Sequence, residues 1–212
     1  MRNGYGHMVH DDLLRRLRAL RIRRAARLQG LETPEAARAY QAEAREAIRC
    51  AFGPWPERAP LNARVTGCLE RPTHRIQKVL FESRPGVLVT ANLYLPLRLD
   101  GPAPAVLGTC GHSANGKASV LYQGFCQRLA RAGFVTLIFD PISQGERDPY
   151  VDLPGREMVT ACTRAHNMMG KQLELLGDFF GAWRAWDGIR ALDYLLSRPE
   201  VDASRIAVAG NS

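Results

Sequence analysis

The sequence has few cysteines and lysines and no long apolar run. No stretch approaches the about 18 apolar residues that a membrane-spanning helix needs, so we expect no membrane partner. The cysteines are scattered, without the CxxC or CxxH spacing of a zinc site and without a disulfide framework, so we interpret them as small buried hydrophobic residues. They are Cys50, Cys68, Cys110, Cys126 and Cys162. No motif indicates a metal or an organic cofactor, and we expect neither.

The start of the chain, MRNGYGHMVHDD, has no apolar core like that of a signal peptide. If Met1 is the true start, this indicates a cytoplasmic protein. Secretion stays open if the true start lies upstream.

Arginine supplies almost all of the positive charge. The net charge is +8, and only three of the 29 basic residues are lysines: Lys78, Lys117 and Lys171. Seven arginines fall between Arg15 and Arg27, where the leucines at 13, 17, 20 and 28 share one face of a predicted helix. Such a helix binds an anionic surface or a partner, or it forms a solvated face, which we favour. No aromatic residue interleaves with the arginines, so we expect no nucleic-acid partner.

The first third of the chain is predicted to be helical and to end in a linker. A second helix over residues 34–52 has Thr33 as its N-cap and Pro34 at its first position. The stretch GPWPERAPLNARVTG is rich in proline and glycine, which indicates an extended linker. We therefore assign residues 1–70 to a helical N-terminal extension with its linker, and residues 71–212 to one domain.

Beyond residue 70 the pattern is that of an α/β protein. Residues 74–83 and 87–97 alternate in polarity around a turn, as in a hairpin. Three short apolar runs predict buried strands, and two segments between them have helical periodicity. The strands are residues 103–111, 134–140 and 205–210, and the helices are residues 119–133 and 179–198. This order predicts a parallel sheet covered on both faces, with an irregular stretch over residues 141–177.

The last residues are Gly210, Asn211 and Ser212, directly after an apolar strand. A strand followed by Gly-x-Ser is the first half of the nucleophile elbow G-x-S-x-G, which lifts a serine hydroxyl above the carboxyl ends of the strands. Such a serine needs a base, and it needs backbone N–H groups directed at the developing oxyanion. One N–H belongs to the residue after the serine, and the other to the loop after an earlier strand, here residues 111–113.

Three longer stretches carry a resemblance to a known family. They are PAVLGTCGHSANGKAS, LARAGFVTLIFDPISQGER and FFGAWRAWDGIRALDYLLSRPEVDASRIAVAGNS, with the patterns GH-x3-GK, DP-x2-QGER and WRAWDG-x-RALDYL. Over residues 60–212 the sequence resembles the α/β-hydrolase superfamily, and more closely bacterial esterases of the acetylxylan esterase and dienelactone hydrolase type. The resemblance implies an α/β-hydrolase fold, with a mostly parallel sheet flanked by helices, that is incomplete at the C-terminus of this chain.

The resemblance also implies roles for individual residues. Ser212 is the implied nucleophile, and the backbone N–H of His112 is the implied second oxyanion donor. Ser113 and His166 are candidates for contact with the substrate, a small-molecule or carbohydrate ester. The chain departs from the family pattern at Ser143, where DP-x-GQGER has glycine.

In α/β-hydrolases the triad acid and base follow the serine, and no residue follows Ser212 in this sequence. We therefore expect the N-terminal part of a serine esterase, inactive as the 212-residue chain. A peptidase of the prolyl-oligopeptidase kind fits the same fold. The alternative from another class is a non-catalytic binding or scaffold protein that uses a truncated hydrolase fold and its basic N-terminal helix. The oligomeric state stays open.

Polar residues around the predicted site also have structural interpretations. Asp140 fits the cap of the turn after its strand, and Glu146 and Arg147 fit a pair within that turn. His166 is typical of a surface loop. On the helix over residues 179–198, the spacing of Asp187 and Arg190 predicts a surface ion pair. Trp183 and Trp186 on that helix are interpreted as packing residues rather than as a platform for a sugar.

Overall fold

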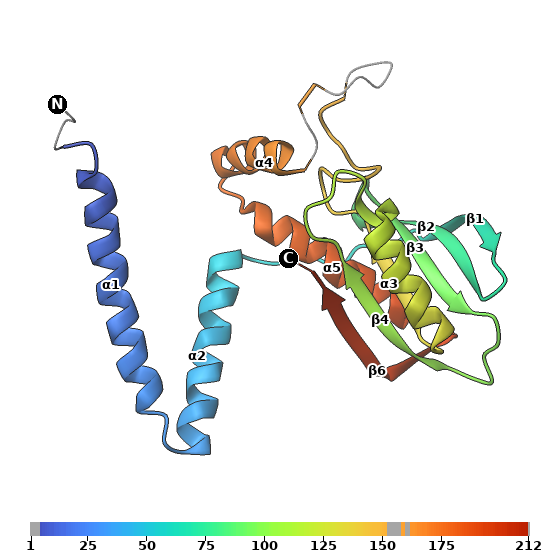
Figure 1. Cartoon of the computed structure of the whole chain (residues 1–212), viewed down its shortest axis with the longest axis horizontal. Helices are drawn as coiled ribbons and strands as arrows, with labels where there is room; N and C mark the ends of the chain where they lie inside the picture. Colours follow the sequence, from blue (N-terminus) through green and yellow to red (C-terminus); the bar gives the residue numbers. More distant parts are fainter. Residues whose placement is uncertain (1–4, 152–157, 160–161, 212) are drawn as a thin grey trace. The chain divides into compact units, whose positions relative to one another are not determined.

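The computed structural model describes residues 5–151, 158–159 and 162–211. The chain divides into two compact units, Met1–Ala51 and Phe52–Ser212, and each is described by itself. The first unit contains α1 (Met8–Gln29) and all but the last residue of α2 (Pro34–Phe52) (Figure 1).

Helix α2 spans the predicted residues 34–52, and α1 contains the predicted arginine-rich helix. Thr33 caps α2, because its Oγ1 accepts the N–H of Ala36 at 3.1 Å. No residue of α1 is buried, and the predicted leucine stripe stays open: Leu13, Leu17 and Leu20 are 52–54 % exposed. The stripe is therefore present on the helix, but α2 does not bury it.

The second unit is built on a six-stranded sheet within the described residues, in the order β1-β2-β3-β5-β4-β6. The strands are β1 (Arg64–Glu70), β2 (His74–Arg84), β3 (Val87–Pro96), β4 (Ala103–Thr109), β5 (Val135–Phe139) and β6 (Val201–Gly210). The predicted hairpin is confirmed as β2 and β3, and β4 runs parallel to both β5 and β6. Because β3 joins β5 in the antiparallel sense, the sheet is mixed.

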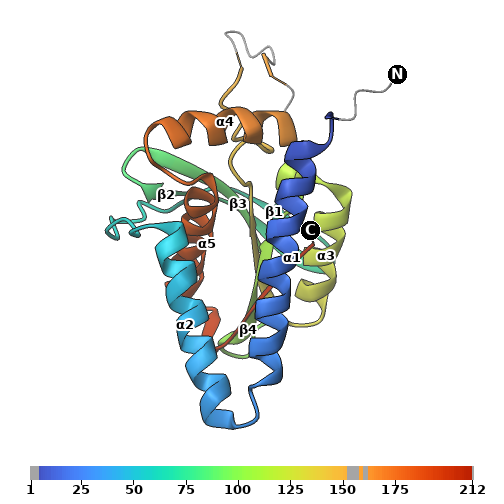
Figure 2. The same ribbon diagram turned by 90° about the vertical axis from the view of Figure 1, so that its left-hand side faces the viewer.

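Helices cover both faces of this sheet. They are α3 (Val120–Arg131) and α5 (Phe180–Leu196). A short 3₁₀ helix, η1 (Gly116–Ala118), precedes α3, and α4 (Thr163–Leu175) packs against α5. Figure 2 shows α3 and α5 on opposite sides of the strands. All five residues of β5 are buried, as a strand covered on both faces requires. None of the helices in the described residues combines the length and the apolar composition that a membrane crossing requires.

The two sheet faces carry separate apolar clusters. One packs Phe81, Leu137 and neighbouring strand residues against Tyr194 and Leu195 of α5. The other packs Tyr94 and neighbouring strand residues against the residues of α3 that face the sheet. These two clusters fix the positions of the strands, and thereby the points from which the loops at the strand ends begin.

The two tryptophans of α5 are packing residues, as predicted. Trp186 is buried, and its Nε1–H donates to the carbonyl of Ser83 at 2.7 Å. Trp183 lies beneath the guanidinium of Arg84, whose Cζ is 3.9 Å from the ring centre. Both rings thereby fasten α5 to the end of β2.

Two elements differ from the prediction. β1 occupies residues 64–70, which the sequence assigns to the linker and extension; six of its seven residues are exposed, so it lacks the alternation of a half-buried strand. Helix α4 lies within the stretch predicted to be irregular. Its buried residues, Ala165, His166 and Leu173, form no apolar stripe, and Gly170 in its interior lowers helix propensity by about 1 kcal/mol relative to alanine.

The cysteines are only partly buried as predicted. Cys110, Cys126 and Cys162 are buried, whereas Cys50 and Cys68 are exposed, so the prediction is wrong for these two. Cys50 lies on α2, which has no buried residue, and Cys68 lies on the exposed strand β1.

We expect the open edge of β6 to promote self-association. Within the described residues β6 pairs only with β4, and Val208 near its end is 64 % exposed. Unpaired N–H and C=O groups beside apolar side chains recruit further strands. In size-exclusion chromatography the chain should elute above its 23.5 kDa monomer mass, and Val208→Lys should shift it toward the monomer.

The matched control is Val120→Lys, which places the same charge on an exposed helix position and should leave the elution unchanged. A monodisperse monomer of the unchanged chain, with a cooperative unfolding transition, would contradict the prediction.

Candidate active site

Three parallel strands end at one edge of the sheet. Gly108 of β4 pairs with Ile138 of β5, and Thr109 pairs with Gly210 of β6. The segments that follow these strands therefore gather at a single edge, where α/β proteins bind their ligands. A Cβ on Gly210 would lie 2.0 Å from the Thr109 Oγ1, so the end of β6 needs glycine. Ser212, the predicted nucleophile, lies outside the described residues.

Asp140, the first residue after β5, is fully buried and forms the centre of this edge. Its Oδ1 accepts the backbone N–H of Lys117 at 2.8 Å. Its Oδ2 accepts the hydroxyl of Thr90 at 2.7 Å, the N–H of Glu146 at 3.3 Å and the ammonium group of Lys117. The prediction that Asp140 caps its turn is confirmed, and the same carboxylate also joins that turn to β3 and η1.

Two glycines fold around this carboxylate. Gly116 has φ +49° and Gly145 has φ +59°, both in the left-handed region. A Cβ on either would lie 2.1–2.2 Å from the Asp140 Oδ1. Both positions therefore need glycine for the backbone angle and for the close approach. The GK and QGER patterns therefore each supply one of the two glycines that pack against the Asp140 carboxylate.

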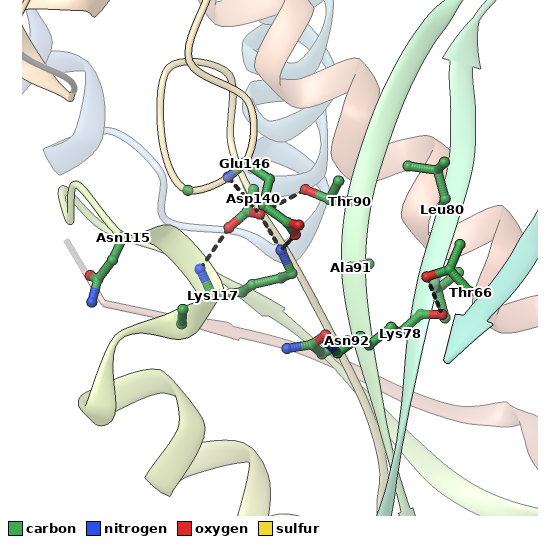
Figure 3. Close-up of a pocket in the computed structure, with 13 residues that line it drawn as sticks. Thr66, Lys78, Leu80, Thr90, Ala91, Asn92, Asn115, Lys117, Asp140 and Glu146 are labelled. Carbon is green, nitrogen blue, oxygen red and sulfur yellow. Dashed lines mark hydrogen bonds and ion pairs between the residues drawn. The ribbon is translucent and has the colours of Figure 1, made fainter. Parts of the chain in front are cut away.

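Lys117 is a buried lysine, with a side chain 7 % exposed. Its ammonium group forms ion pairs with Asp140 and with Glu146, and Figure 3 shows the three side chains together. A buried charge needs such partners to offset its lost hydration. The sequence contains this lysine in a motif, but spacing along the chain gives no signal for its partners.

The predicted pair between Glu146 and Arg147 is wrong, because Glu146 turns to Lys117. Arg147 instead donates to the Asp187 Oδ2 at 2.7 Å and to the Asp140 carbonyl at 3.0 Å. The predicted surface ion pair between Asp187 and Arg190 is also wrong, since both residues are buried. Arg190 pairs with Asp193. Asp187 of α5 thus faces the turn after β5, and Arg190 also donates to the carbonyl of Ala59 in the segment before β1.

The loop between β4 and η1 contains the predicted oxyanion donor. The N–H of Gly111 donates to the hydroxyl of Tyr122 at 2.6 Å, and its carbonyl accepts from the Gln144 Nε2 at 2.9 Å. The same Nε2 donates to the carbonyl of Ser113 at 2.7 Å. Between these two carbonyls, the N–H of His112 meets no acceptor among the described residues. His112 itself is exposed.

Cys110 opens this loop but is no nucleophile. Its thiol is buried beneath the loop, 3.5 Å from the carbonyl of Phe139. Burial, together with the nearby carboxylate of Asp140, raises the pKa of the Cys110 thiol to about 12. The thiolate, which is the reactive form, is therefore scarce at neutral pH.

His166 lies on α4 and faces the predicted oxyanion loop; it is not a surface-loop histidine. It is 7 % exposed, and its Nε2 carries the proton, because it lies 2.9 Å from the carbonyl of Ile142. Its ring centre is 5.2 Å from that of His112 and 5.4 Å from that of Phe180. Burial, then the charge of Arg184, lowers its pKa. The structure thus brings together two predicted site residues, His112 and His166.

A cavity of about 620 Å³, lined by both polar and apolar residues, adjoins the loop (Figure 3). Lys117, Asp140 and Glu146 line it on one side, and Lys78 and Asn92 line it from the strands. Its volume is that of a small-molecule site, but none of the described residues that line it is aromatic. Within the described part of the chain, no three His, Cys, Asp or Glu side chains are grouped to hold a metal ion.

Comparison with known proteins agrees with this architecture. No protein-family model matches the sequence. The Bacillus subtilis (strain 168) protein named "Putative hydrolase YtaP" is 24% identical over 182 residues, which cover 81% of this chain and 56% of that protein. The crystal structure of "a putative acetyl xylan esterase" from Bacteroides fragilis superposes with a TM-score of 0.68 at 19% identity, over 85% of this chain and 48% of that one.

A second solved structure, an acetyl xylan esterase from Paenibacillus sp. R4, gives a TM-score of 0.53 at 25% identity, over 73% of this chain and 47% of that one. The chain has the α/β-hydrolase fold. The expected resemblance to acetylxylan esterases is confirmed at this level. The chain spans about half the length of these proteins.

Ser143, where the resemblance implies glycine, has a backbone angle that favours glycine. It has φ +66° and is fully buried. Its hydroxyl is among the buried groups that find no hydrogen-bond partner in the described residues. The turn keeps this angle because the Ser143 N–H donates to the Arg147 carbonyl and the Ser143 carbonyl accepts the Cys162 N–H, both at 2.8 Å. A left-handed angle costs an L-residue about 1–2 kcal/mol, so the serine is a strained substitute.

We expect Ser143→Gly to stabilise the protein by about 1–2 kcal/mol, because it removes the left-handed strain and a buried hydroxyl without a partner. Urea unfolding at pH 7 gives the shift. The matched control is Ser83→Gly, since Ser83 is also buried with an unpartnered hydroxyl but lies in β2 with an ordinary backbone. Ser83→Gly should destabilise the fold, and stabilisation by both variants would show that the backbone angle is not the cause.

We expect the stability of the fold to fall as the pH drops below about 6.5, the ordinary pKa of histidine. Burial lowers the pKa of His166 in the folded state, so the unfolded chain binds more protons in this range and acid favours unfolding. His166→Gln should make urea midpoints less sensitive to pH between 7.5 and 5.5. His74, whose pKa burial also lowers, accounts for part of the remaining slope. An unchanged slope would contradict the assignment to His166.

Proposed function

We propose that this protein is a serine carboxylic-ester hydrolase that acts on acyl or acetyl esters of carbohydrates or other small molecules. The observation that carries the proposal is the N–H of His112. It lies on an exposed, anchored loop at the carboxyl edge and meets no acceptor in the described part of the chain. At the same edge β6 runs into Gly-Asn-Ser. The substrate class is supported by the names of the Bacteroides and Paenibacillus esterases.

In the proposed reaction, the Ser212 hydroxyl attacks the carbonyl carbon of the ester and passes its proton to a base. The carbonyl electrons move onto oxygen, and the N–H groups of His112 and of the residue after the serine stabilise that oxyanion. Collapse of this intermediate expels the alcohol and leaves an acyl-enzyme, which water then hydrolyses by the same steps. Ser113 beside the donor is the proposed contact for the substrate.

The base of this reaction is not His166 in our proposal. Its Nε2–H is engaged by the carbonyl of Ile142 and its ring is buried, whereas a base must reach the serine hydroxyl. We propose His166 instead as a wall of the substrate site beside His112. In the α/β-hydrolase fold the acid and base follow the serine, so we propose that the 212-residue chain alone lacks them.

We expect no turnover of p-nitrophenyl acetate by the 212-residue chain above that of its Ser212→Ala variant, because a serine without a base is a poor nucleophile. The protein translated from the same start to the stop codon of its gene should hydrolyse this ester. There, Ser212→Ala should lower kcat by at least about 10³-fold.

Two outcomes would contradict the proposal. Turnover by the 212-residue chain that Ser212→Ala abolishes would place the acid and base within this chain. A stop codon directly after Ser212, together with no turnover, would favour the binding or scaffold protein with the basic α1 as its contact surface.

A further inference from the structure

We infer that Gln144 is a positioning residue, which directs the N–H of His112 toward the oxyanion of the bound ester. The inference rests on the proposed function and assigns a role to a side chain that touches neither the ester nor the serine in that mechanism. It follows from the two carbonyls that Gln144 holds, on either side of His112.

The orientation of the Gln144 amide is fixed by its partners. Its Nε2 lies 2.9 Å from the carbonyl of Gly111 and 2.7 Å from that of Ser113. Only an NH₂ group can donate to both, since the reversed amide would set the Oε1 against two carbonyl oxygens. Gln144 is fully buried, so water does not compete for these bonds.

Holding the carbonyl of Gly111 also sets the direction of the His112 N–H. The two groups belong to one planar trans peptide, in which C=O and N–H point in opposite directions. Because the carbonyl points toward Gln144, the N–H points away from it, out of the buried side of the loop. Rotation of this peptide would break the bond from Gln144 to the Gly111 carbonyl. The preceding peptide is held as well, because the Gly111 N–H donates to the hydroxyl of Tyr122.

Gln144 is a rigid anchor because its own turn is held in place. Its N–H donates to the carbonyl of Pro141 at 3.1 Å, and the next residue, Gly145, donates to the carbonyl of Ala114 at 2.8 Å. The turn closes around the buried carboxylate of Asp140. An oxyanion donor is effective when it is oriented before the charge develops, and this arrangement provides such an orientation.

Packing alone does not explain a glutamine at this position. The Oε1 of Gln144 is buried and has no hydrogen-bond partner among the described residues. A buried acceptor without a partner destabilises a fold, and methionine would fill nearly the same volume without that defect. The two hydrogen bonds to the loop are what the amide adds.

The first test measures the loop directly, in the 212-residue chain. In Gln144→Met, the carbonyl ¹³C resonances of Gly111 and Ser113 should move to the positions of carbonyls without a hydrogen bond, and the His112 amide resonance should broaden or shift. The matched control is Gln123→Met. The Gln123 Nε2 also donates to a backbone carbonyl, that of Ala118 at 2.7 Å, so its loss should move that resonance alone.

The second test measures turnover by the protein translated to the stop codon of its gene, with p-nitrophenyl acetate as substrate. Loss of one oxyanion donor lowers kcat by about 10²–10³-fold, so a donor that is present but misdirected should lower it by about 10- to 100-fold. KM should change by less than about threefold, because the contact forms in the transition state. Gln123→Met should retain the kcat of the unchanged protein.

If Gln144→Met does not fold, Gln144→Glu replaces it. This variant keeps the shape of the side chain and can donate one hydrogen bond when its carboxyl is protonated, so the ¹³C shifts should recover in part as the pH is lowered.

Unmoved resonances of Gly111, His112 and Ser113 would overturn the inference, as would a kcat that stays the same despite moved resonances. If the unchanged protein shows no turnover, the proposed function fails, while the ¹³C shifts still decide whether Gln144 orients this peptide.

Discussion

The buried carboxylate of Asp140 is the contact on which the carboxyl edge of the sheet depends. It ties three segments that are distant in the sequence: β3 through Thr90, η1 through Lys117, and its own turn through Glu146. Removing one member of a buried ion pair commonly costs about 3–5 kcal/mol, because the other charge is left without compensation. The positions of the loops at the carboxyl edge of the sheet therefore depend on the buried charge of Asp140.

The residues that anchor the site are buried, while the loop that they hold is open to solvent. The anchoring residues Asp140, Lys117 and Gln144 are all buried, whereas His112, on the loop between β4 and η1, is exposed. A loop that is hydrogen-bonded only on its buried side leaves the backbone groups on its exposed side without partners. This is how a surface segment keeps one conformation while its unpaired N–H stays open to a ligand.

The sequence predicts those features whose signals are local. The hairpin of β2 and β3, the Thr33 cap and the turn cap at Asp140 each follow from alternation or from a neighbouring residue type. The sequence does not predict β1, because this strand is exposed on both faces. It does not predict α4 either, because Gly170 inside this helix lowers its helix propensity. The partners of Lys117 and Gln144 lie 23 to 33 residues away, and no spacing rule connects them. The left-handed Ser143 appears in the sequence only as a departure from a family pattern.

The burial of Lys117 has a consequence for the chemical labelling of this protein. The chain has three lysines, and the other two, Lys78 and Lys171, are exposed. Reagents that acylate amines will therefore modify these two lysines, and they will leave the ammonium group of Lys117 beside Asp140 intact in the folded state. Acylation of Lys117 is thus a chemical marker of the opened loop, readable by mass spectrometry without any substrate.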